Sequence, residues 1–516
     1  MSQVNILWVD DEIESLKSQI LFLENRGYHV TALTNGYDAL EFLKDQIVDV
    51  VLLDESMPGI TGLETLTKIK EQDLQVPVVM ITKNEAENVM DEAIGSQITD
   101  YLIKPVNPNQ VLLCLKKIID NKRLVAEKTT IAYQQEFRSL FMALSSNPDH
   151  KEWMDIYKKL VYWEMEMEKA DSPEMMEVFN NQKAEANTEF AKFISRNYAS
   201  WIKNSDEAPT LSHTLFRDKV FPYIDPEIPN FFILIDNLRY DQWKAIQPIF
   251  AESFRLIEED SFYSILPTST QYSRNAIFSG MLPVDIEAKF PQEWKNDDDE
   301  GGKNMYEEHF FADQLARARK DLKFSYTKVL NHNDGQHLVN NIHNMMNYQL
   351  NIIVYNFVDM LSHARTEMEV LKELAGDETS YRSIITSWFE HSPLHQALKK
   401  ISDKKINLFL ATDHGSVRVK TPIKVIGDKQ TTTNLRYKHG RNLNYDPKEV
   451  LAFRDPKDAG LPRPNVNSSY IFAREDGYLC YPNNYNYFVN YYKNTFQHGG
   501  ISLEEMIVPV ARMVSK

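Results

Sequence analysis

Five side chains able to support phosphoryl transfer follow apolar runs in the first 120 residues. Three of them are carboxylates, which would repel one another at one edge of a sheet unless a cation lay among them, and oxygen ligands suit Mg²⁺. A lysine and a hydroxyl complete the set and could hold phosphoryl oxygens. A single acid of this kind is ordinarily a solvated strand end, but five such side chains at four strand ends indicate phosphoryl transfer to Asp54. The five residues are Asp10, Asp11, Asp54, Thr82 and Lys104.

A second group of strand-end residues lies between positions 230 and 500. Aspartate combined with histidine, without cysteine, suits Zn²⁺, with Mn²⁺ as the alternative. Six such ligands are too many for one tetrahedral site and suit two ions, which together can clamp the attacking and leaving oxygens of a phosphoryl displacement. Each residue alone is unremarkable, so the prediction depends on the ordered set. The six ligands are Asp236, Asp359, His363, Asp413, His414 and His498.

The run ILPTSTQYSRNAIFSG supplies hydroxyls directly before a predicted helix. A hydroxyl at Thr268, Ser269 or Thr270 could be deprotonated by a metal and become a nucleophile. Arg274 and Asn275, one turn further on, could hold phosphate oxygens.

Hydrophobic patterning indicates the elements that must position these side chains. In residues 1–121, short apolar strands alternate with amphipathic helices, which predicts a doubly wound parallel sheet with its ligands at the carboxyl ends of the strands. Residues 122–205 contain no glycine and carry an apolar stripe at helical spacing that includes Trp153 and Leu160, which predicts a helical segment with an ordinary core. Residues 206–516 return to buried strands and form the predicted C-terminal α/β domain.

Composition narrows the classes of protein. The 43% hydrophobic and 25% charged residues are those of a globular protein. No apolar run approaches the ~20 residues of a membrane span, and the first residues lack a secretory signal. We therefore expect a cytoplasmic protein without membrane insertion, whose Cys114 and Cys480 are free buried thiols.

The net charge of −17 opposes non-specific binding to nucleic acid. Residues 418–441 are an exception, because they contain seven Lys or Arg and one acid, Asp428. This stretch is either a solvated loop or a guide for an anionic substrate beside the metal ligands. The acidic run at 297–302 is interpreted as a solvated insertion loop.

The motifs VDDE, LLDESMPGITGLE, MITK and YLIKP resemble those of the response-regulator receiver domain across about the first 120 residues. The resemblance implies that the three acids bind Mg²⁺, that Asp54 is phosphorylated, and that Thr82 and Lys104 contact the phosphoryl group. It also makes Tyr101 a switch residue and predicts a cis peptide bond before Pro105.

The stretches FFILIDNLRYDQW, LPTSTQYSRNAIFSG, NFVDMLSH, LFLATDHG and QHGGISLEEMIVP resemble the PglZ branch of the alkaline phosphatase superfamily. The resemblance implies two zinc sites and a threonine nucleophile that bridges to the second site. Thr270 aligns with this nucleophile, and Thr268 is its competitor. The first zinc site would be Asp359, His363 and His498, and the second Asp236, Asp413 and His414.

The order receiver, helical segment and PglZ-type domain resembles PorX-like response regulators of bacteria that use type IX secretion. That resemblance implies phosphorylation by a sensor histidine kinase, a zinc phosphodiesterase output, and linear or cyclic oligonucleotides as the substrate class. Phosphorylation is expected to favour a homodimer through receiver pairing. Two alternatives stay open: an interaction platform that keeps metal only for stability, and a transcriptional regulator acting through a sigma factor or DNA.

Overall fold

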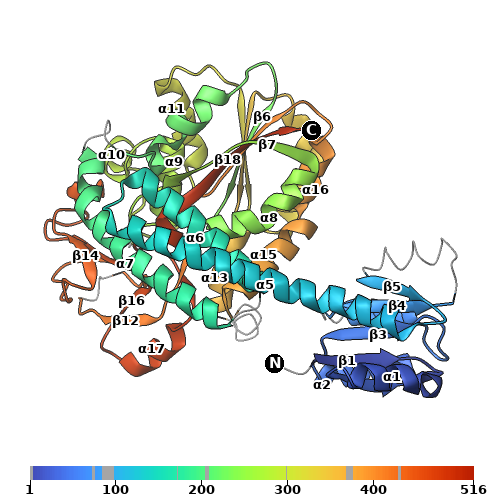
Figure 1. Ribbon diagram of the computed structural model, residues 1–516. Coiled ribbons are helices and arrows are strands. Elements are labelled where there is room, and N and C mark those ends of the chain that lie inside the picture. Colours follow the sequence, from blue (N-terminus) through green and yellow to red (C-terminus); the bar gives the residue numbers. More distant parts are fainter. Residues whose placement is uncertain are drawn as a thin grey trace. The chain divides into compact units, whose positions relative to one another are not determined.

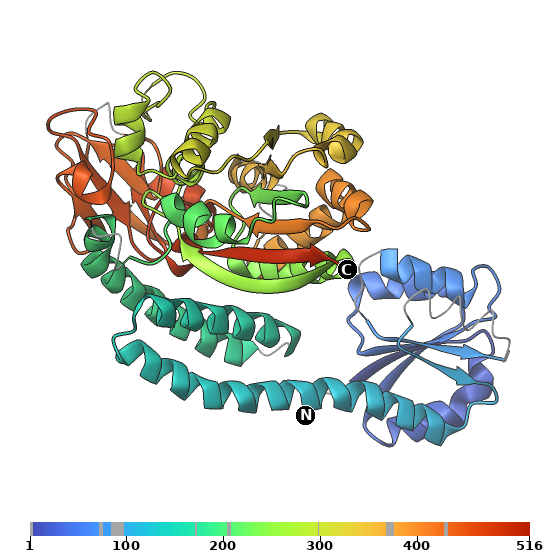
Figure 2. The same ribbon diagram turned by 90° about the horizontal axis from the view of Figure 1, so that it is seen from above.

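The computed structural model describes residues 4–71, 76–83, 98–170, 173–203, 208–297, 299–367, 376–427 and 432–516, without the side chains of 119–127 and 364–367. The chain forms two compact units, Met1–Ala132 and Tyr133–Lys516. Figures 1 and 2 show their elements from two directions. Within the described ranges, no helix combines the length and apolar character needed to cross a bilayer.

A parallel five-stranded sheet forms the first unit, in the order β2-β1-β3-β4-β5. Side chains alternate along a strand, so Ile6 and Trp8 of β1 enter one core while Leu7 and Val9 enter the other. Helices α1 and α5 cover the first face, and α2 and α3 cover the second. This is the predicted doubly wound receiver fold. The elements are β1 (Val4–Val9), η1 (Ile13–Leu16), α1 (Lys17–Glu24), β2 (Tyr28–Leu33), α2 (Gly36–Asp45), β3 (Val50–Asp54), α3 (Gly62–Glu71), β4 (Val78–Thr82), β5 (Asp100–Ile103) and α5 (Pro108–Ser145).

A mixed six-stranded sheet forms the centre of the second unit, in the order β7-β18-β10-β6-β9-β8 (Figure 1). Strands β10, β6, β9 and β8 run parallel, whereas β18 and β7 are antiparallel to their neighbours. The parallel strands therefore end at the same edge, as the sequence predicts. The strands are β6 (Asn230–Ile235), β7 (Phe254–Tyr263), β8 (Phe324–Val329), β9 (Leu350–Tyr355), β10 (Asn407–Ala411) and β18 (Ile507–Ser515).

Helices cover both faces of this sheet. Phe232 and Leu234 of β6 pack with helices α9 and α11, whereas Phe231 and Ile233 face the core that contains α8. The helices are α8 (Tyr240–Ser253), α9 (Thr270–Ser279), α10 (Pro283–Lys289), α11 (Glu307–Arg317), α12 (His332–Met345), α13 (Phe357–Glu367), α15 (Glu378–His391), α16 (Pro393–Ile401), α17 (Tyr485–Tyr492) and α18 (Leu503–Met506).

Short strands build the remainder of the C-terminal part. β11 pairs with β17, β12 with β16, and β15 lies between β13 and β14. These strands are β11 (Val417–Arg418), β12 (Thr421–Lys424), β13 (Tyr437–Gly440), β14 (Val450–Phe453), β15 (Ser469–Ala473), β16 (Gly477–Cys480) and β17 (Phe496–Gln497).

The predicted helical segment consists of the end of α5 together with α6 (His150–Ala170) and α7 (Pro173–Lys203). The apolar stripe of α6 is buried, and Trp153 packs edge-on to Phe190 of α7 at a ring-centroid distance of 5.3 Å. Phe190 in turn stacks on Tyr263 of β7, so the segment shares one core with the C-terminal domain. The boundaries after residues 121 and 205 stay predictions.

Candidate active site

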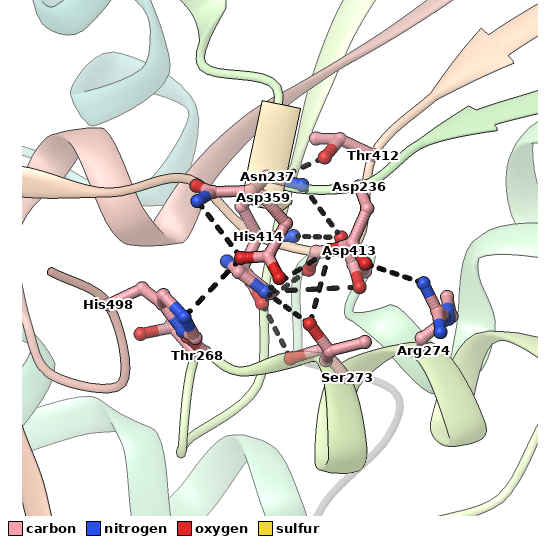
Figure 3. A network of polar contacts seen from close by, with 12 residues as sticks. Asp236, Asn237, Thr268, Ser273, Arg274, Asp359, Thr412, Asp413, His414 and His498 are labelled. Carbon is pink, nitrogen blue, oxygen red and sulfur yellow. Dashed lines mark hydrogen bonds and ion pairs between the residues drawn. The ribbon is translucent and has the colours of Figure 1, made fainter. Parts of the chain in front are cut away.

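Four of the six predicted metal ligands lie beyond the ends of neighbouring strands, and His363 lies four residues after Asp359 on α13. Asp236 follows β6, Asp359 lies in the first turn of α13 after β9, and Asp413 and His414 follow β10. Because β10, β6 and β9 are adjacent and parallel, their carboxyl ends bring these side chains together. His498 follows β17 and faces the same place (Figure 3).

Asp359 lies at the centre of the group. One ligand atom each of Asp359, His363 and His498 falls within 4.8 Å of the others, and the same holds for Asp236, Asp359 and His414. His498 Nε2 lies 3.6 Å from Asp359 Oδ1, and His414 Nε2 lies 3.6 Å from Asp236 Oδ1. His363 is the exposed member, with 64% of its side chain accessible.

Asp413 lies beside these residues, and one of its two carboxylate oxygens makes no hydrogen bond to a described residue. Its Oδ1 accepts hydrogen bonds from the backbone N–H groups of Asn237 and His414 at 3.2 and 3.1 Å. Its Oδ2 is buried and makes no hydrogen bond to any described residue, and it lies 3.9 Å from His414 Nε2. An uncompensated buried carboxylate oxygen is costly, so this atom fits a ligand to a cation.

The pKa shifts of these side chains also indicate a site for a cation. Burial, followed by the negative charge of Asp236, raises the pKa of Asp359 to about 6 and raises the pKa of Asp413 well above its usual range. Burial and the neighbouring His414 and His363 lower the pKa of His498 well below its usual range. A cation among these groups would favour ionised carboxylates and neutral imidazoles, which are the forms that bind metal.

Thr270 begins α9 and points into this group. Its Oγ1 lies 3.1 Å from both Asp236 Oδ1 and His414 Nε2. The Oγ1 of Thr268 is committed elsewhere, because it donates to the carbonyl of Gly500 and accepts from the N–H of Gly499. The geometry therefore favours Thr270 over Thr268 as the hydroxyl beside the ligands.

Arg274 and Asn275 have different surroundings. Arg274 Nη1 donates to Asp236 Oδ2 at 2.6 Å and its Nε donates to Glu307 Oε1 at 2.5 Å. Asn275 does not reach the candidate site as predicted, because its amide donates to the carbonyls of Gln271 and Lys303. An asparagine one residue from Arg274 on α9 points about 100° away around the helix, which explains the difference.

A cavity of about 400 Å³ opens beside these side chains. Two parts of its lining were not predicted from the sequence to border the site: the loop Gly302–Met305 and Lys328 of β8. Asp297, in the run interpreted as a solvated loop, instead accepts hydrogen bonds from Tyr272 and Tyr437. Asp298 lies outside the described residues.

The basic stretch 418–441 is not a solvated loop along its whole length, and two of its basic side chains are not available to guide a substrate. Arg436 and Lys438 are buried, and Arg436 pairs with Glu505 at 2.6 Å. Lys438 donates to the carbonyls of Thr432 and Asn434. Residues 428–431, which include Asp428, lie outside the described residues.

The predicted acidic site of the first unit assembles at the ends of β1 and β3. One oxygen each of Asp10, Asp11 and Asp54 falls within 4.8 Å of the others. Lys104 Nζ lies 2.8 Å from Asp10 Oδ2 and 2.9 Å from Asp54 Oδ1. Burial is the largest cause that raises the pKa of Asp54, and Asp10 adds to it while Lys104 opposes it.

The other receiver residues lie close to this site. The hydroxyl of buried Thr82 donates to the carboxylate of Glu55, the residue after Asp54. Tyr101 is 40% exposed. The predicted cis peptide bond between Lys104 and Pro105 is confirmed.

Comparison with protein families divides the chain in the predicted order. Residues 6–116 match the response regulator receiver domain, residues 123–202 the PorX response regulator linker domain, and residues 215–513 the BREX system PglZ alkaline phosphatase-like domain. Receiver domains use Mg²⁺, and alkaline phosphatase-like domains are metal-dependent.

Individual relatives resemble the N-terminal part. Transcriptional regulatory protein ZraR of Klebsiella oxytoca is 35% identical over 128 residues, which are 25% of this chain and 29% of ZraR. Phosphoglycerate transport system transcriptional regulatory protein PgtA of Salmonella typhimurium is 29% identical over 132 residues, which are 26% of this chain and 32% of PgtA. The chain thus spans about a third of the length of these two relatives.

Among solved structures, chemotaxis protein CheY4 of Vibrio cholerae is 28% identical, with a TM-score of 0.22, and the match covers 23% of this chain and 99% of CheY4. From the three domain matches and their order, the chain belongs to the PglZ alkaline phosphatase-like family and is a PorX-like response regulator, in which a receiver domain precedes a PorX linker domain and a phosphoesterase-like domain.

Proposed function

We propose that the C-terminal domain is a zinc-dependent phosphodiesterase that uses Thr270 as its nucleophile. One observation carries the proposal: Thr270 Oγ1 lies 3.1 Å from both Asp236 and His414, within a group of aspartates and histidines that border an open cavity. A nucleophile held within hydrogen-bond reach of a proton acceptor is the arrangement that covalent catalysis requires.

The side chains of the site fit two metal ions. Asp359, His363 and His498, whose ligand atoms lie within 4.8 Å of one another, would hold one ion. Asp236 and His414 would hold the other together with Asp413, whose buried Oδ2 makes no hydrogen bond to a described residue and lies 3.9 Å from His414 Nε2. When bound, two Zn²⁺ ions would supply Lewis-acid stabilisation of the attacking and leaving oxygens.

The chain's own residues would orient the reaction. Arg274 holds one oxygen of Asp236 and leaves the other facing Thr270. The Thr270 hydroxyl would pass its proton to water as its oxygen bonds to phosphorus, and the departing ester oxygen would take a proton from water. Water would then cleave the resulting threonyl phosphodiester at its bond to Thr270, which restores the hydroxyl and releases a phosphomonoester.

Charge favours a diester over a monoester. Two divalent ions and three carboxylates leave one positive charge, and a deprotonated Thr270 would offset it, so the ligand set would hold no excess positive charge for the second negative charge of a monoester. Each described basic side chain that lines the cavity already bonds to protein acceptors: Arg274 to Asp236, Lys303 to a carbonyl of its own loop, and Lys328 to Glu307. Met305 and Leu330 also line the cavity and are 71% and 46% exposed, which suits an apolar second substituent.

The receiver implies regulation by a sensor kinase. We propose that this partner is a histidine kinase and that it phosphorylates Asp54. We also propose that Asp10, Asp11 and Asp54 bind Mg²⁺ at this site. Oligonucleotide-like substrates, a homodimer formed on phosphorylation, a sigma factor partner and a role in type IX secretion stay predictions from the family resemblance.

Hydrolysis of bis(4-nitrophenyl) phosphate and 4-nitrophenyl phosphate tests the proposal. We expect the diester to be cleaved faster, activity to vanish with chelator and return with Zn²⁺, and Thr270→Ala to lose at least ~10³-fold in kcat with its zinc retained. Exposed Thr421 in the same unit supplies the control Thr421→Ala, which should keep full activity. Chelator-insensitive hydrolysis, or an active Thr270→Ala protein, would refute the proposal.

A further inference from the structure

The loops that carry His414 and His498 meet at one residue of α18, Glu505. The backbone carbonyl of Glu505 accepts a hydrogen bond from the N–H of Gly415, the residue after His414, at 3.2 Å. Its side-chain Oε1 accepts from the N–H of Gly500, two residues after His498, at 2.9 Å. A single buried residue thus ties together the loops that carry His414 and His498, whose rings stack at a centroid distance of 4.3 Å.

Glu505 is itself held firmly. Arg436 donates from Nε to Oε1 at 3.0 Å and from Nη2 to Oε2 at 2.6 Å, and both side chains are fully buried. The Ser502 hydroxyl adds a bond to Oε2 at 2.8 Å. Paired donors of this kind fix a carboxylate in one orientation.

Thr268 extends this connection to the nucleophile loop. Its hydroxyl accepts from the N–H of Gly499 and donates to the carbonyl of Gly500, and its own carbonyl lies 3.3 Å from His498 Nδ1. The loop that precedes Thr270 is therefore bonded to the same segment that Glu505 anchors.

The helical segment holds α18 from the other side. Asn187 of α7 accepts from the N–H of Leu503 at 2.8 Å and donates to Glu504 Oε2 at 3.2 Å. Lys183, one turn earlier, lies 3.1 Å from Glu504 Oε1 and 2.9 Å from Glu164 of α6. Asn187 is 8% exposed and the Lys183 side chain 15%, so these polar contacts are largely shielded from water.

The backbone of the His414 loop packs closely against α18. A Cβ atom at Gly415 would clash with the backbone carbonyl of Glu504. A displacement of Glu504 toward Gly415 would therefore shift the backbone of Gly415, which is the residue after the predicted ligand His414.

We propose that Lys183 and Asn187 of the helical segment are positioning residues for the metal centre, acting through Glu504 and Glu505 of α18 on the His414 and His498 loops. This inference rests on the proposed metal site. Residues outside the ligand set that orient the ligands contribute ~10–100-fold to metal affinity or activity. The helical segment would thus help to position the metal ligands, in addition to connecting the two flanking domains along the chain.

The test uses the full chain with Lys183→Met, Asn187→Leu and the milder Asn187→Ser, which retains a hydroxyl. We expect zinc affinity, measured by chelator competition, to fall by about ten-fold or more in the first two variants. Amide hydrogen exchange at Gly415 and Gly500 should accelerate, and kcat should fall with KM retained. Lys192→Met is the control, because Lys192 lies on the same helix in an exposed pair with Glu189.

Lys183→Arg should restore zinc affinity and amide protection, because it keeps the charge facing Glu504. Zinc affinity within about two-fold of the unchanged chain, with unaltered exchange at Gly415 and Gly500, would overturn the inference even if the variants melt earlier. Should Lys183→Met and Asn187→Leu not fold, the same outcomes are read from Asn187→Ser. If the unchanged chain cleaves no diester, the proposed activity fails separately, and the amide exchange still decides this inference.

Discussion

Removal of the Arg274 guanidinium should destabilise the metal-free protein about twice as much as the metal-loaded protein. Arg274 bridges Asp236 and Glu307 at 2.6 and 2.5 Å, and all three side chains are at most 2% exposed. Arg274→Gln leaves two buried carboxylates short of a positive partner. Breaking a buried pair in this way costs about 3–5 kcal/mol.

The two carboxylates would not be affected equally. Glu307 keeps Lys328 at 3.0 Å and the hydroxyl of Tyr326, whereas Asp236 loses the only cationic side chain that contacts it among the described residues. A bound cation would compensate Asp236, so we expect about half of the loss in unfolding free energy to disappear when Zn²⁺ is added.

Urea-induced unfolding, followed with chelator and with Zn²⁺, measures both values. Arg463→Gln is the matched control, because Arg463 pairs with Asp455 at 2.8 Å where the side chains are 35% and 46% exposed, and its loss should cost about 0–1 kcal/mol. A loss for Arg274→Gln as small as that of the control would show that Arg274 does not compensate buried Asp236, and an equal loss with and without zinc would show that no cation binds beside Asp236.

Three further outcomes are expected. Asp54→Ala should abolish acid-labile phosphorylation by acetyl phosphate, whereas Asp45→Ala should not, and a phosphorylated Asp54→Ala chain on a phosphate-affinity gel would contradict the assignment. Because the pKa of Asp359 is raised to about 6, protons should compete with zinc for this carboxylate as the pH falls from 7 to 5. Titration calorimetry should show that zinc affinity falls over this range as the free protein takes up protons. A zinc affinity that does not change with pH would contradict this expectation. Gly415→Ala should lower the free energy of unfolding by about 1–3 kcal/mol through the clash with Glu504 and weaken zinc binding, and unaltered thermal melting would show that the loop has room to move.

The metal-ligand candidates were accessible from sequence because their signal is local. Asp236 directly follows β6 and Asp413 lies two residues after the end of β10, and parallel strands bring such ends to one edge of a sheet whatever the conformation of the loops between them. The same holds for Asp10 and Asp54 in the first unit. Strand-end position therefore suffices to gather them without any knowledge of packing.

The supporting residues were not accessible in this way. Arg436 and Glu505 are 69 positions apart and form a fully buried pair, yet each has the residue type of a solvated surface position. Charge alone predicts exposure, and only the long-range packing of β13 against α18 reverses it. Asn275 was predicted to border the site, but its side chain lies on another face of α9, whereas its neighbour Arg274 contacts Asp236.

Anomalous diffraction at the zinc absorption edge, from crystals of the purified chain, locates the metal ions independently of any activity. We expect two peaks per chain, one among Asp359, His363 and His498 and the other among Asp236, Asp413 and His414, with Thr270 beside the second. A single peak elsewhere, or zinc-loaded crystals without density at these side chains, would contradict the proposed two-ion centre.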